Sequence, residues 1–60
     1  MKQSDIPHKL RLIHDNLKEV SDAMIEHAMD DFWIMHAGQL AGAARLTAEW
    51  ADEIEKEIQP

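Results

Sequence analysis

Two pairs of carboxylates are spaced so that a helix would bring each pair onto one face. Glu19 and Asp22 form the first pair, and Glu49 and Asp52 form the second. Residues three apart are neighbours on a helix surface, and carboxylate oxygens are the ligands that Mg²⁺ takes in proteins. The pairs therefore define one alternative function, a metal-dependent hydrolase that uses Glu-x-x-Asp pairs.

The rest of the chain gives this chemistry little support. The sequence contains no cysteine, its serines are Ser4 and Ser21, and it has no glycine-rich phosphate loop. An antiparallel pair of helices would also hold Glu19 far from Glu49, so the two pairs would not share a metal. We therefore expect surface carboxylates, with no enzymatic activity, no metal and no cofactor.

Four histidines are a second possible source of metal ligands. They are His8, His14, His27 and His36, and no two of them are four residues apart, as two ligands on one helical face would be. His27 and Asp31 have that spacing, but they would share a face only if the helix continued through Asp30. The sequence thus predicts solvated histidines and not a metal site.

Length and charge limit the remaining functions. The chain has 60 residues, with 12 acidic and 6 basic residues and a formal net charge of -6. Such a charge opposes binding to nucleic acid or to an anionic membrane. No apolar stretch approaches the roughly 18 residues of a membrane span. We expect one small cytoplasmic domain over residues 1–60, in a size range where oligomers often supply missing stability.

The first half of the chain has the apolar periodicity of an amphipathic helix. Ser4 or Asp5 could cap it, and Pro7 is tolerated in the first turn of a helix. The apolar residues then recur at steps of three and four, which predicts a helix over about 6–28: Ile6, Leu10, Ile13, Leu17, Val20, Met24 and Ala28.

An acidic turn at about 29–31 is expected to follow. Asp30 is a plausible N-cap, with Met29 and Ile34 at the spacing of a hydrophobic staple, and a second helix would run over about 31–58 and stop at Pro60. A turn at Gly38 and a single long coiled-coil helix are the alternatives. Charge favours the acidic turn, because an antiparallel hairpin about it brings Arg11 beside Asp52.

The second helix would carry two neighbouring apolar seams, which implies two partners. We expect the large seam to pack on the first helix: Leu40, Ala43, Thr47, Trp50, Ile54 and Ile58. The small seam would meet a second copy, so that two hairpins form a four-helix bundle. The expected dimer interface comprises Phe32, Trp33, Ala37, Ala41, Ala44, Ala48 and Ala51. The alternative is that the alanines are good helix formers on an exposed face.

The overall fold class predicted is all-α, an antiparallel helical hairpin that dimerises. In size, charge and helical content the chain resembles the small acidic helical accessory proteins of temperate phages. Its hairpin outline with an acidic turn also resembles the plasmid copy-control RNA-binding protein, a four-helix bundle, but the basic surface needed for RNA is absent.

We therefore expect a non-enzymatic protein-protein interaction or regulatory module, a homodimer with an unidentified protein partner. The expected partner surface comprises Leu12, Asp15, Glu19, Asp22 and Glu26. Its carboxylates also suggest an alternative, an acidic mimic of nucleic acid that blocks a host DNA-binding enzyme.

Overall fold

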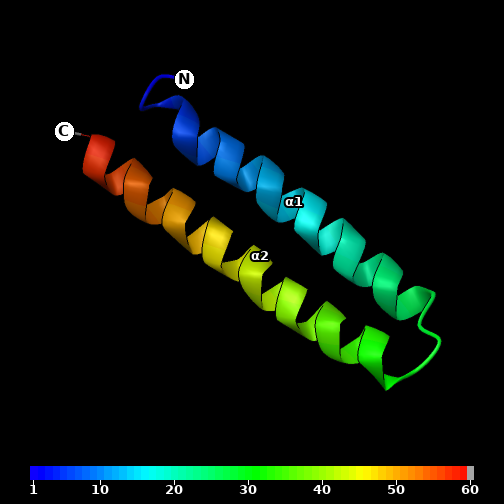
Figure 1. Ribbon diagram of the computed structural model, residues 1–60. Coiled ribbons are helices and arrows are strands. Elements are labelled where there is room, and N and C mark those ends of the chain that lie inside the picture. Colours follow the sequence, from blue (N-terminus) through cyan, green and yellow to red (C-terminus); the bar gives the residue numbers. More distant parts are fainter. Residues whose placement is uncertain (60) are drawn as a thin grey trace.

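The computed structural model describes residues 1–59 and consists of two antiparallel helices (Figure 1). Helix α1 spans Asp5–Glu26 and helix α2 spans Asp31–Ile58. The pair is elongated, with Cα extents of 48 × 15 × 13 Å, and both termini lie at the end opposite the turn. The predicted all-α hairpin is confirmed. The predicted stop at Pro60 lies outside the described residues.

The turn occupies residues 27–30, so α1 ends two residues earlier than predicted. Asp30 has an extended backbone, and its side chain accepts a hydrogen bond from the Phe32 amide at 3.1 Å, as an N-cap does. Met29 is 84% exposed, which does not support the expected staple. Gly38 lies inside α2, where an added Cβ would meet no atom within 4 Å, so the alternative turn at Gly38 is not adopted.

The N-terminus of α1 is not capped by a side chain in the way that the sequence predicts. Ser4 occupies the N-cap position but makes no side-chain capping bond. The carboxylate of Asp5 instead accepts a hydrogen bond from the Lys2 amide at 3.0 Å. Pro7 in the next turn is buried, which its missing N–H permits because the first four amides of a helix have no helical partner.

The helices meet along a line of small or short side chains at intervals of seven residues. We call this the contact line, and it consists of Pro7, His14 and Ser21 from α1 and Ala37, Ala44 and Ala51 from α2. The three alanines are at most 2% exposed, and Ser21 is 2% exposed. Side chains this small let two helix backbones approach closely.

This packing reverses the expected assignment of the two seams. Ala37, Ala44 and Ala51 were expected to meet a second copy, but they are buried against α1 of the same chain. The large seam was expected to meet α1, yet its Trp50 is 49% exposed and its Leu40 and Ile54 are only half-buried. The physical reason is that the buried face of α1 is itself narrow, with Ser21 and His14 in place of large apolar residues.

Candidate interaction surfaces

Two side chains of α1 bind the backbone of α2 within the contact line. The Ser21 hydroxyl donates to the carbonyl oxygen of Ala37 at 2.8 Å, and His14 Nδ1 lies 2.8 Å from the carbonyl oxygen of Ala44. Because a carbonyl oxygen only accepts, the His14 Nδ1 must carry the proton. The two bonds are seven residues apart on both helices, so together they fix the antiparallel register.

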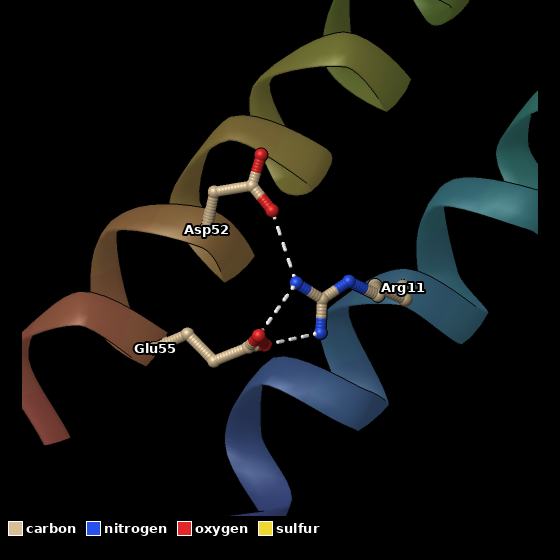
Figure 2. Close-up of polar contacts among 3 residues, drawn as sticks. All are labelled: Arg11, Asp52 and Glu55. Atoms are coloured by element: carbon tan, nitrogen blue, oxygen red, sulfur yellow. Dashed lines mark hydrogen bonds and ion pairs between the residues drawn. The ribbon is translucent and has the colours of Figure 1, made fainter. Parts of the chain in front are cut away.

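An ion-pair cluster joins the helices on one side of the contact line (Figure 2). Arg11 from α1 contacts Asp52 at 3.0 Å and Glu55 at 2.8 Å, with a further bond to Glu55 at 3.2 Å. The hydrogen bonds that Arg11 donates, first to Glu55 and then to Asp52, raise the pKa of Arg11 above its ordinary value. The pairing of Arg11 with Asp52 was expected from the sequence, whereas Glu55 was not identified.

The residues beside this cluster make up what we call the polar flank. Each follows a contact-line residue by four positions, which places them on one side of the pair: Arg11, Lys18, Ile25, Ala41, Ala48 and Glu55. A shallow groove here is lined by His14, Lys18 and Ala41 among others. Ala41 and Ala48, expected at a dimer interface, lie on this side and are not fully buried.

The opposite side is mainly apolar along its length, with His36 and Thr47 as its polar members. Its residues follow the contact line by three positions or precede it by one or four, and in an antiparallel pair these sets fall on the same side. We call this side the apolar flank: Ile6, Leu10, Ile13, Leu17, Val20, Met24, Trp33, His36, Leu40, Ala43, Thr47, Trp50 and Ile54. Met24 and Leu40 line one shallow groove there, which confirms that the two helices contribute to the same side.

No residue of the apolar flank is well covered. Ile13 is 45% exposed, Val20 is 51% exposed, and the others are half-buried apart from Trp50 at 49%. Among residues 1–59 no large side chain is fully buried anywhere. The hairpin therefore leaves its largest apolar residues partly exposed.

The carboxylate and histidine candidates are dispersed. Asp52 of the second Glu-x-x-Asp pair is held by Arg11. His36 Nδ1 lies 2.8 Å from the Phe32 carbonyl oxygen, and the two rings stack with centroids 4.1 Å apart. In the described part of the chain, no three histidine, aspartate or glutamate side chains are grouped to hold a metal ion.

The remaining predicted residues are exposed, apart from Trp33. The expected partner surface lies along α1, with Leu12 44% exposed and its four carboxylates exposed: Asp15, Glu19, Asp22 and Glu26. Phe32, expected in the dimer interface, is 59% exposed, and Trp33 is half-buried on the apolar flank. The position of the apolar flank could have been predicted from the sequence. Pro7, His14 and Ser21 recur every seven residues, and so do the three buried alanines of α2.

Comparison of the chain with protein-family models, with curated proteins and with solved structures finds no match. Neither helix in residues 1–59 combines the length and the apolar character that crossing a membrane requires.

Proposed function

We propose that the chain is a non-enzymatic interaction or regulatory protein that acts as a homodimer. Two hairpins pack with their apolar flanks face to face, which gives a four-helix bundle. The observation that supports this proposal is the length of the apolar flank, which extends from Ile6 near one end to Trp33 near the other. The resemblance to phage accessory proteins stays a prediction.

The need for a second copy follows from the lack of a core. The contact line buries only alanines, a proline and a serine, which is little apolar area for a chain of 60 residues. Covering the apolar flank would bury Val20, Ile13 and Trp50 together with the half-buried residues between them. A dimer would supply the large-residue core that one hairpin lacks.

Size and charge of the apolar flank suit a copy of the same chain. A face bounded by the extents of 48 and 15 Å is on the order of 700 Å², close to the roughly 800 Å² per partner of a standard interface. It carries no carboxylate, lysine or arginine, and His36 is its one ionisable member, so two copies meet without repulsion between carboxylates. The twofold arrangement is also the commonest closed form of a homo-oligomer.

Sedimentation equilibrium of the wild-type chain and of Val20→Glu tests the dimer. We expect the wild type at micromolar concentration to have twice the monomer mass of 6.9 kDa. Val20→Glu should dissociate it, because a carboxylate would be buried at the interface. Leu46→Glu is the matched control, since Leu46 is 47% exposed and follows Ala44 by two positions, away from the apolar flank. A wild-type monomer that unfolds cooperatively would refute the proposed dimer.

A further inference from the structure

The turn end of the hairpin carries a second exposed apolar surface. Five large apolar side chains within residues 25–35 are each more than half exposed, and we call them the turn-end cluster: Ile25 at 53%, Met29 at 84%, Phe32 at 59%, Ile34 at 53% and Met35 at 58%. They come from the last turn of α1, the connecting turn and the first turns of α2. Apolar exposure of this density marks a contact surface.

Face-to-face packing of two apolar flanks would leave most of this cluster uncovered, although Phe32 stacks on His36 at the edge of the apolar flank. Ile25 follows Ser21 by four positions, and Ile34 precedes Ala37 by three, so both lie on the side of the polar flank. Met29 is in the turn, outside both helices. The turn-end cluster is therefore a separate surface, available whether the chain is a monomer or a dimer.

The charge of the molecule is concentrated around the turn-end cluster. Between Lys18 and Arg45 the sequence has no lysine or arginine, while it has five acidic residues, all exposed: Glu19, Asp22, Glu26, Asp30 and Asp31. These five account for all but one unit of the net charge of -6, because the other residues carry seven acids and six bases. The turn half of the hairpin is strongly anionic, and the other half is nearly neutral.

We propose that the turn-end cluster binds a basic amphipathic segment of another protein, most simply a helix with one apolar face and one lysine- or arginine-rich face. The apolar face would cover Met29, Ile34 and Met35, and the basic face would meet the surrounding carboxylates. Methionine suits such a surface, because its flexible, polarisable side chain adapts to different apolar partners.

The same charges argue against other occupants. A second copy docking through its own turn end would bring two clusters of five acids together, which costs free energy. Nucleic acid and anionic membranes would be repelled in the same way. The inference rests on the proposed role in protein interaction, but it does not depend on the proposed dimer.

Fluorescence anisotropy with three labelled synthetic peptides tests the proposal on the full chain. The probe is an amphipathic leucine–lysine helix of about 18 residues. One control has the same composition in scrambled order without an apolar face, and the other has glutamate in place of lysine. We expect the probe to bind at least about tenfold more tightly than either control, and equal binding of the scrambled peptide would overturn the proposal.

Substitutions locate the binding surface. Met29→Gln with Met35→Gln should weaken binding of the probe by about tenfold or more, because truncating interface anchors typically has effects of this size. Leu46→Gln is the control, because Leu46 is 47% exposed and lies outside both the cluster and the expected partner surface. A control variant with an equal loss of affinity would refute the assignment.

Two further readouts separate this proposal from the proposed dimer. Val20→Glu changes the apolar flank, so it should leave the affinity for the probe unchanged even where it dissociates the dimer. A loss of peptide binding in Val20→Glu would instead place the peptide on the apolar flank. Met29→Gln with Met35→Gln should leave the sedimenting mass unchanged, and a lower mass would assign the turn-end cluster to self-association.

Discussion

The Ser21 hydroxyl donates a 2.8 Å hydrogen bond to the carbonyl oxygen of Ala37 at a position that is closed to solvent. The Ala37 carbonyl already belongs to the hydrogen-bond ladder of α2, so the serine adds a second bond to an acceptor with two lone pairs. The contact between helices therefore depends on side chain to backbone bonds as well as on apolar contact.

Ser21→Ala should lower the free energy of unfolding by about 0.5 to 1.5 kcal/mol, the usual net value of one hydrogen bond. The Ala37 carbonyl would keep its helical partner, so no buried acceptor would be left unsatisfied. Urea denaturation measures the change. The control is Ala23→Ser, which measures the difference in helix propensity between the two residues at an exposed position of α1; a Ser21→Ala variant as stable as the wild type after this correction would mean that the interhelical bond contributes nothing.

Ala44→Leu should destabilise the hairpin by about 1 to 3 kcal/mol, because a larger side chain overpacks the contact line. Ala44 is 2% exposed, and leucine is itself a good helix former, so loss of helix propensity cannot explain a lower stability. Ala41→Leu, at an exposed position one turn earlier, should be close to neutral. Thermal melts that rank the two variants in the opposite order would contradict the burial of Ala44 against α1.

Asp30→Ala should cost about 1 kcal/mol, because the Phe32 amide loses its capping acceptor. Gly38→Ala should stabilise the chain by up to about 1 kcal/mol, since Gly38 is inside α2 with open space around it. Circular dichroism during urea unfolding measures both. Destabilisation by Gly38→Ala would show that the backbone at this position is not helical.

Arg11→Met should lower stability at low salt, and the difference from the wild type should shrink as salt is added. Methionine keeps the length and helix propensity of the residue but removes the charges that meet Asp52 and Glu55. Denaturant midpoints at low and high ionic strength give the comparison. If the stability difference between Arg11→Met and the wild type does not change with salt, the loss comes from packing of the arginine stem and not from its charge.

The position of the turn could be predicted from the sequence because it is set by local chemistry. An aspartate before an apolar run is a strong helix start, and the α2 bounds agree with the prediction of 31–58. The register was less accurate: a hairpin centred on Asp30 and Asp31 would place His14 opposite Thr47, whereas His14 meets Ala44. The cause is the earlier end of α1 at Glu26, which moves the centre of the turn toward the N-terminus.

The seam that faces α1 could not be predicted by apolar periodicity alone. Periodicity identifies which residues of α2 lie together, but the large seam containing Trp50 and the small seam containing Ala44 are both compatible with a helical partner. The choice depends on the shape of α1, where His14 and Ser21 favour small opposing residues. Their bonds to α2 carbonyls have no periodic signature, because any residue supplies the acceptor.

Both termini lie at the end of the hairpin opposite the turn (Figure 1). A fluorescent protein fused to either terminus would therefore stand clear of the turn, at a separation that approaches the 48 Å length of the molecule. Fused reporters would also distinguish the two possible orientations of paired hairpins. Energy transfer between the reporters would be stronger if the hairpins ran parallel than if each turn lay beside the termini of the other copy.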